Sequence, residues 1–186
     1  MGPSPRAPVA LISRPGIRPS TLPPPRAGLR PAGVHARSSH APPATELAHP
    51  HQRRFWRVLP GIGRIGLSAG SWYTETLREE ARSQRALGQV ADDAERIRDF
   101  EKLLADGGTL IVKVWLQLSK DAQGRRLRTL RSDPATAWRV TEEDWHHHRI
   151  YDRLAGTARL IRSKTDRPGA RWTIIDAEDE RARDLA

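Results

Sequence analysis

The sequence predicts an α/β protein in which helices cover a parallel β-sheet. Three short apolar runs, at 63–69, 109–118 and 171–176, have the length and composition of strands. The stretches between them carry helical periodicity and helix end signals. Strands separated by helices imply right-handed crossovers and therefore a parallel sheet. Three strands leave long exposed edges, so we expect this segment to be part of a larger domain or half of an assembly.

The first expected strand, 63–69, is followed by two helices. Ser71 is a residue type that caps helices, and polar and apolar residues then recur at helical spacing to about residue 88. A second helix is expected over 90–105, where apolar residues recur at intervals of three and four. Gly107 and Gly108 supply its stop.

The central strand and the helices after it follow from similar signals. The run 109–118 is the most apolar in the chain and is interrupted only by Lys113 and Gln117. Ser119 is placed to cap a strongly cationic helix over 120–131. A long helix is expected from Thr141 to Arg162, because acids in its first turn complement the helix dipole. The last strand precedes a short helix over 178–185.

Composition divides the chain near residue 51. Residues 1–50 hold 12 of the 15 prolines and no aromatic residue, so we expect 1–51 to be a disordered tail and 52–186 to be the folded part. The chain has no cysteine, which excludes disulfides and thiolate metal sites and fits a cytoplasmic protein. No apolar run approaches membrane-spanning length.

The segment from Ser119 to Arg126 combines a helix amino terminus with closely spaced cations. Exposed backbone amides at such a terminus favour phosphate, and Lys120, Arg125 and Arg126 add charge-assisted hydrogen bonds. These three residues are therefore candidate phosphate ligands. Taken alone, the same pattern also fits a solvated basic helix face.

The spacing of this segment resembles the lid signature of family-2 polyphosphate kinases, roughly Ser-Lys-x-x-Gln-x-x-Arg. The family's Asp-Pro-x-x-x-Trp-Lys turn has its counterpart at 133–139. Residues 55–66 resemble its Tyr-Trp-Arg-x-Leu-Pro segment, 70–74 its Ser-Trp-Tyr turn, and 171–179 its final strand and acidic turn. The resemblance covers roughly residues 52–186 and is closest to the polyphosphate:AMP phosphotransferases.

The resemblance implies a P-loop kinase-like fold that transfers a phosphoryl group between inorganic polyphosphate and AMP or ADP with Mg²⁺. It also implies a lid at about 119–164, polyphosphate contacts at Lys120, Arg125 and Arg126, and a nucleotide contact at Trp138 and Arg139. Trp72, Trp115, Trp145 and Trp172 are expected in the core. The run 146–148 is expected to be surface histidines, because consecutive helical residues point in different directions. Asp176 and Asp179 fit either ligands or helix caps.

Two departures from the family suggest a degenerate half of such an enzyme. No glycine-lysine pair exists in the chain, so we expect the phosphate-binding loop and the strand before it to be missing. Ala69 and Gly70 replace the acid or amide and the arginine that assist magnesium and phosphate. We therefore assign no catalytic or metal-binding residue to this chain.

Three functions remain open from the sequence. In the first, the chain is a polyphosphate-dependent nucleotide phosphotransferase that needs a second polyphosphate kinase domain or self-association. In the second, it is a non-catalytic partner of an active half. A nucleic-acid binder is suggested by the isoelectric point near 11.1 and the net charge of +10. Half of that net charge lies in the expected tail.

Overall fold

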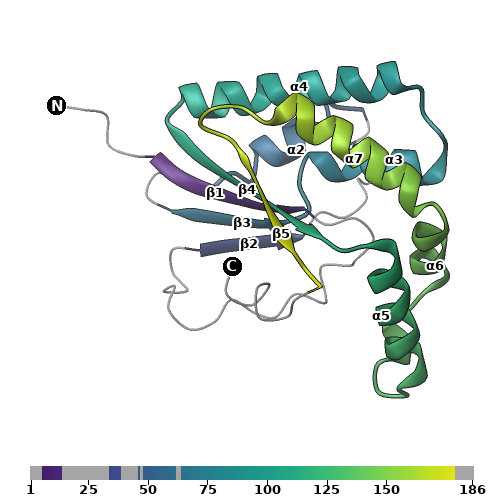
Figure 1. The fold of residues 1–186 in the computed structure, drawn as a ribbon. Coiled ribbons are helices and arrows are strands. Elements are labelled where there is room, and N and C mark those ends of the chain that lie inside the picture. Colours follow the sequence, from purple (N-terminus) through teal and green to yellow (C-terminus); the bar gives the residue numbers. More distant parts are fainter. Residues whose placement is uncertain (1–5, 14–33, 39–45, 47, 62–63, 179–186) are drawn as a thin grey trace.

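The computed structural model describes residues 6–13, 34–38, 46, 48–61 and 64–178. Within these ranges, five parallel strands form one sheet: β1 (Arg6–Ser13), β2 (Val34–Ser38), β3 (Ile65–Ala69), β4 (Thr109–Gln117) and β5 (Trp172–Asp176). Their order across the sheet is β2-β3-β1-β4-β5, so β1 lies between β3 and β4 (Figure 1). The predicted α/β class and parallel sheet are confirmed.

Two of these strands lie in the segment that the sequence predicts to be disordered, residues 1–51. β1 pairs with β3 and β4, and β2 pairs with β3. The expectation of a three-stranded sheet without its first strand is therefore wrong. Strand pairing uses backbone groups, so a proline-rich segment still pairs where its prolines do not interrupt the ladder. Pro8, which has no N–H, lies at a register shift in the β1–β4 pair.

Much of the remaining predicted tail lies outside the described residues, as does nearly all of the final helix predicted over 178–185. The segment between β1 and β2, residues 14–33, also lies outside them.

Three of the helices lie on one side of the sheet. The helical segments are α2 (Arg53–Trp56), α3 (Tyr73–Arg82), α4 (Leu87–Asp106), α5 (Lys120–Ser132), the 3-10 helix η3 (Ala137–Arg139), α6 (Glu142–Arg149) and α7 (Tyr151–Thr165). α3, α4 and α7 cover the same side, whereas α5 and α6 project beyond the carboxyl ends of the strands (Figure 1). In the described ranges, no helix combines the length and apolarity needed to cross a bilayer.

The long helix predicted over 141–162 is two helices, α6 and α7, which meet at Ile150. Contacts to other elements hold the two parts separately. The His146 ring nitrogen Nε2 lies 3.0 Å from the Ala81 carbonyl oxygen of α3, and the Tyr151 hydroxyl donates to the Leu118 carbonyl oxygen at 2.6 Å. The break therefore follows from tertiary contacts and not from a local breaker residue.

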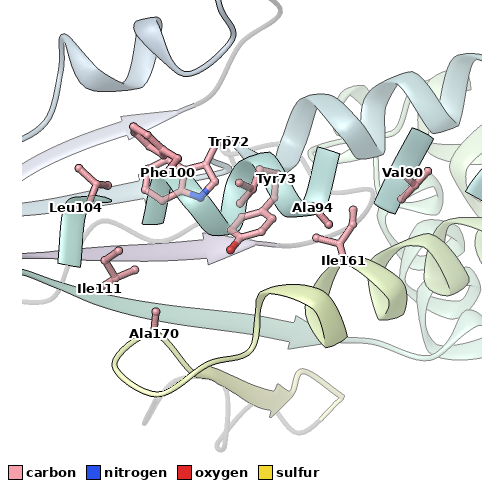
Figure 2. Close-up of a cluster of buried hydrophobic side chains, with 10 residues drawn as sticks. Trp72, Tyr73, Val90, Ala94, Phe100, Leu104, Ile111, Ile161 and Ala170 are labelled. Atoms are coloured by element: carbon pink, nitrogen blue, oxygen red, sulfur yellow. The ribbon is translucent and has the colours of Figure 1, made fainter. Parts of the chain in front are cut away.

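The core lies between β4 and the helices that cover it. Its buried cluster consists of Trp72, Tyr73, Val90, Ala94, Ile97, Phe100, Leu104, Ile111, Ile161 and Ala170 (Figure 2). Trp72 contacts Phe100 and Phe55 edge-on, with ring centroids 5.1 and 5.7 Å apart. The members from α4 form the apolar stripe that the sequence predicts for this helix. Trp72 and Trp115 are core residues, as expected.

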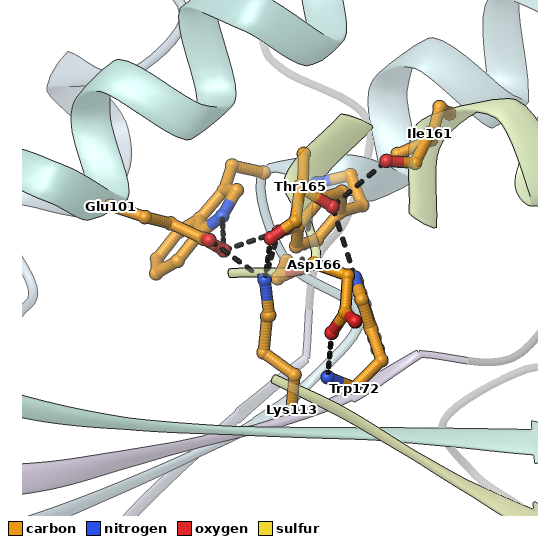
Figure 3. Close-up of polar contacts among 9 residues, drawn as sticks. Glu101, Lys113, Ile161, Thr165, Asp166 and Trp172 are labelled. Atoms are coloured by element: carbon orange, nitrogen blue, oxygen red, sulfur yellow. Dashed lines mark hydrogen bonds and ion pairs between the residues drawn. The ribbon is translucent and has the colours of Figure 1, made fainter. Parts of the chain in front are cut away.

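A charged pair is buried within this core (Figure 3). Lys113 of β4 and Glu101 of α4 are both fully buried, and Lys113 Nζ lies 2.9 Å from Glu101 Oε2. The ammonium also donates to the Thr165 carbonyl oxygen at the end of α7, at 2.7 Å. Glu101 Oε1 accepts hydrogen bonds from Trp72 Nε1, at 3.1 Å, and from the Tyr73 hydroxyl. One buried pair therefore joins a strand to three helical segments.

Burial and ion pairing have opposite effects on the pKa of Lys113. Burial lowers the pKa of Lys113, because a low-dielectric surrounding disfavours the charged form, and Glu101 opposes that change. The ammonium also lies 5.0 Å from the centroid of the Trp172 ring, where the electron-rich face attracts a cation. Removing either partner would leave an uncompensated buried charge.

We expect Lys113→Met to lower the free energy of unfolding by about 3–5 kcal/mol, because it leaves the Glu101 carboxylate buried and unpaired. Urea unfolding followed by circular dichroism measures this. The double variant Lys113→Met with Glu101→Gln should recover part of the loss.

The matched control is Lys102→Met, which breaks the exposed Lys102–Asp106 pair, 2.6 Å long, on the same α4 helix. Such surface pairs contribute about 0–1 kcal/mol. Equal losses in the two single variants would contradict the structural role assigned to Lys113.

Candidate functional site

The candidate site lies at the carboxyl ends of the strands. β3 ends at Ala69, β4 ends at Gln117 and continues into α5, and β5 ends at Asp176. This edge of an open parallel sheet is where α/β proteins bind their ligands. The sequence-predicted site residues at 69, 70 and 120 stand at or just beyond these strand ends.

The turn after β3 carries no side chain suited to bind phosphate or metal at the two predicted degenerate positions. Ala69 is the last residue of β3, and Gly70 adopts φ +76°, a left-handed conformation that glycine accepts without strain. The next three residues, 71–73, are almost completely buried. The turn is therefore anchored firmly in the core, immediately beside two positions without polar side chains.

The amino end of α5 is capped as the sequence predicts. Ser119 adopts an extended conformation, and its hydroxyl accepts a hydrogen bond from the Ala122 backbone N–H at 3.2 Å. The chain just before the cap is held by the Tyr151 hydroxyl, which also accepts a hydrogen bond from Gln117 Nε2 at 3.1 Å. Both contacts fix the direction in which α5 leaves the sheet.

The predicted phosphate ligands lie on α5, and two of them are paired with carboxylates. Lys120 Nζ lies 2.5 Å from Asp152 Oδ2 of α7, and an Arg125 Nη2 lies 3.7 Å from Glu178 Oε2. The third, Arg126, is half-buried on the same helix. The structure thus brings the three cations onto one element, and two of them already have anionic partners.

Glu178 is a site residue that the sequence analysis missed as a partner of α5. Its Oε1 accepts a hydrogen bond from the Ser119 backbone N–H at 3.2 Å, so a carboxylate occupies the amino end of the helix. Hydrogen bonds from Ser119, together with Arg125, lower the pKa of the Glu178 carboxyl. Asp152, the partner of Lys120, was missed as well. Neither contact is local in sequence, so no short-range pattern signals it.

The predicted nucleotide contacts lie at the other end of α5. Trp138 is 73% exposed, and the Arg139 guanidinium carbon lies 5.7 Å from the centroid of its ring. The indole Nε1 donates to the Ala135 carbonyl oxygen at 2.9 Å, which fixes the ring's orientation. Because α5 has 13 residues and rises about 1.5 Å per residue, its two ends are about 20 Å apart. The structure therefore does not bring Trp138 together with Lys120.

The three consecutive histidines face different neighbours. His146 contacts the Ala81 carbonyl oxygen, whereas His148 Nδ1 lies 3.1 Å from Gln123 Oε1 of α5. His147 is half-buried, and burial lowers its pKa. All three are partly buried between helices, so the expectation of surface histidines is wrong in that respect. Asp176 accepts a hydrogen bond from the Glu178 backbone N–H at 2.9 Å, whereas Asp179 lies outside the described residues.

Magnesium, which the family resemblance implies, does not fit the described residues. In these ranges, no three His, Asp or Glu side chains gather where they could hold a metal ion. Of the acids near this edge, Asp152 pairs with Lys120, Glu178 binds the amino end of α5, and Asp176 accepts a hydrogen bond from the Glu178 backbone N–H. We therefore assign no magnesium ligand among the described residues.

Comparison with known proteins links this geometry to a family. The family model described as Polyphosphate kinase 2 (PPK2) matches residues 26–186, beginning upstream of the boundary predicted at 51. Two proteins named polyphosphate:AMP phosphotransferase, from Pseudomonas syringae pv. tomato and Pseudomonas aeruginosa PAO1, are each 38% identical to this chain. The matches cover 75% and 82% of this chain but 28% and 31% of those proteins. The chain thus spans less than a third of their length.

A solved structure has the same fold. The crystal structure of polyphosphate kinase 2 from Arthrobacter aurescens TC1 aligns with a TM-score of 0.85 and covers 98% of this chain and 65% of that one. The sequence identity is 23%, so this likeness concerns the fold.

We expect the pKa of Glu178, measured by NMR titration of its carboxyl carbon, to lie below the ordinary value of 4.5. A lowered folded-state pKa means that the contact with Ser119 is present above that ordinary value and is lost as the pH falls through the lowered one. Ser119→Ala and Arg125→Gln should each raise the pKa of Glu178. A Lys164→Gln control, on α7, should leave it unchanged, and a Glu178 pKa above 4.5 in the wild type would refute the contact.

Proposed function

Because the chain belongs to the polyphosphate kinase 2 family, we propose that it binds inorganic polyphosphate through a lid at about 119–164. This lid comprises α5, η3, α6 and α7 and forms part of an incomplete kinase domain. Lys120, Arg125 and Arg126 contact phosphate groups, since ammonium and guanidinium groups form charge-assisted hydrogen bonds to phosphate oxygens. The proposal is carried by the position of α5, whose capped amino end follows the carboxyl end of β4.

Polyphosphate binding at this lid is an exchange of anionic partners. Lys120 and Arg125 are paired with Asp152 and Glu178, and both pairs are largely exposed to solvent. Exposed pairs contribute little free energy, so a polymer that carries many charges displaces the carboxylates easily. Glu178 and Asp152 then remain in water, where a carboxylate is well solvated.

The nucleotide, AMP or ADP, contacts the lid tip at Trp138 and Arg139. An exposed indole offers a flat face on which a nucleobase stacks, and the neighbouring guanidinium suits a nucleotide phosphate. The two relatives named above carry AMP in their names, which supports a nucleotide as the second ligand.

We also propose that the chain is a degenerate half that does not complete phosphoryl transfer alone. Ala69 and Gly70 leave the edge of the sheet without the charged groups such transfer requires. The chain contains four lysines, and none follows a glycine, so no part of the sequence matches a Gly-Lys phosphate loop. A second polyphosphate kinase domain supplies what is missing, because self-association brings together only copies that share the same losses.

We expect the triple variant Lys120→Ala, Arg125→Ala, Arg126→Ala to bind tripolyphosphate at least about tenfold more weakly than the wild type. Each lost charge-assisted hydrogen bond is worth about 1.5–3 kcal/mol, reduced here by the release of the paired carboxylates. Isothermal titration calorimetry at two salt concentrations measures the affinity and its salt dependence.

The matched control is Arg96→Ala, Arg98→Ala, Lys102→Ala, which removes the same charge as three exposed cations of α4. Equal weakening in both triple variants would point to net charge alone and contradict the lid assignment. Product formation by the purified chain alone, from polyphosphate, magnesium and AMP or ADP, would contradict the degenerate half.

We expect Trp138→Ala to weaken AMP binding about tenfold, because stacking of a base on an aromatic ring contributes about 1–3 kcal/mol. Fluorescence or calorimetric titration with AMP measures this. Trp56→Ala removes another exposed indole, on α2, and serves as the control. An unchanged AMP affinity in the Trp138 variant would show that the lid tip does not contact the nucleotide.

A further inference from the structure

The outer side of α5 carries a stripe of arginines that leads toward the lid tip. Arg125, Arg128 and Arg131 recur at intervals of three residues, so they lie next to one another along the helix, and all three are exposed. Residues 120–139 hold six Lys and Arg residues against two Asp residues, which gives this segment a net charge of +4. An exposed row of like charges attracts a polyanion along its length.

Two arginines of this stripe are available to an anion without displacement of a carboxylate. Arg131 donates to the Val140 carbonyl oxygen at 3.4 Å, and neither Arg128 nor Arg131 pairs with a carboxylate among the described residues. The acid that follows α5, Asp133, is engaged locally, because its Oδ1 accepts a hydrogen bond from the Ala135 backbone N–H at 2.9 Å. The carboxyl half of α5 therefore differs from the amino end, where carboxylates already meet the cations.

The exposed indole at the lid tip is held in a fixed position relative to this helix. Trp138 is 73% exposed, yet its Nε1 donates to the Ala135 carbonyl oxygen at 2.9 Å. The segment that carries it is tied to α5, because the Thr136 hydroxyl donates to the Leu130 carbonyl oxygen at 2.9 Å. A ring that is already held in one orientation loses little conformational freedom when a flat group stacks on it.

We propose that this surface binds single-stranded nucleic acid, with backbone phosphates along Arg128 and Arg131 and a base stacked on Trp138. A single strand combines a polyanionic backbone with unpaired bases, and proteins bind it through cations and aromatic side chains together. Inorganic polyphosphate has no group that stacks on an indole, and one free nucleotide does not extend along the stripe. The inference shares Trp138 with the proposed AMP contact but does not rest on AMP or polyphosphate binding.

The test is the fluorescence anisotropy of a labelled single-stranded RNA of about 12 nucleotides, titrated with the full chain at several salt concentrations. Trp138→Ala removes the stacking surface, whereas Trp138→Phe keeps an aromatic ring. Arg128→Gln with Arg131→Gln removes two cations of the stripe. Its matched control, Arg96→Gln with Arg98→Gln, removes two exposed cations of α4. Thermal unfolding of each variant establishes that it is folded.

We expect Trp138→Ala to bind the RNA about tenfold more weakly than the wild type, and Trp138→Phe to retain most of the affinity. Each phosphate contact to a single strand contributes about 0.7 to the slope of log affinity against log salt concentration, so the variant of Arg128 and Arg131 should lower that slope by about 1.4. The α4 control should leave the slope unchanged.

The same variants separate this proposal from the function proposed above. Tripolyphosphate has no base, so its affinity should be the same in Trp138→Ala as in the wild type. RNA binding that depends on Trp138, together with an absence of AMP binding, would contradict the AMP contact and support this proposal.

Three results would overturn the proposal. The first is an absence of RNA binding to the wild-type chain at low salt. The second is an RNA affinity that is unchanged in Trp138→Ala, which would remove the stacked base. The third is a duplex of the same length that binds as tightly as the single strand, which would show that the surface recognises negative charge alone.

Discussion

The buried pair of Lys113 and Glu101 is the constraint on which the arrangement of the other elements depends. A charged pair in an apolar interior is tolerated only when its geometry is nearly fixed and its remaining hydrogen-bonding capacity is used. Here those requirements are met by groups from the start of α3, from α4 and from the end of α7. Movement of any of these elements would leave polar atoms of the buried pair without hydrogen-bond partners. The sheet edge from which the lid projects therefore has a rigid base.

The lid itself is held by contacts of a different kind. Its cations meet carboxylates in water, at Asp152 and Glu178, and such contacts are readily exchanged. Farther inside, Tyr151 and Arg153 tie α7 to β4 and α3 through partly buried hydrogen bonds. The molecule thus combines a fixed frame with a labile ionic surface. That combination suits reversible capture of a polyanion, since the ligand replaces weak partners and leaves the frame intact.

Local sequence signals predicted the elements whose stability is local. The glycines at 107 and 108 end α4, the apolar run of β4 is an interior strand of the sheet, and Ser119 caps α5. β1 and β2 were missed, because strand pairing is a backbone property that composition does not report. The break at Ile150 and the carboxylate partners of Lys120 and Arg125 were missed for a related reason. Each depends on residues 32 to 65 positions away in the sequence, and a single sequence carries no local trace of such contacts.

The backbone at Gly70 has a consequence for any attempt to place a charged side chain at this edge of the sheet. Its φ of +76° is costly for every residue with a Cβ atom, by roughly 1–2 kcal/mol. An arginine introduced there would therefore tend to rotate the turn, and the turn continues directly into Ser71, Trp72 and Tyr73, which are packed in the core. Repairing the chemistry at this position is consequently a problem of backbone redesign. The new side chain and the shape of the turn have to be designed together.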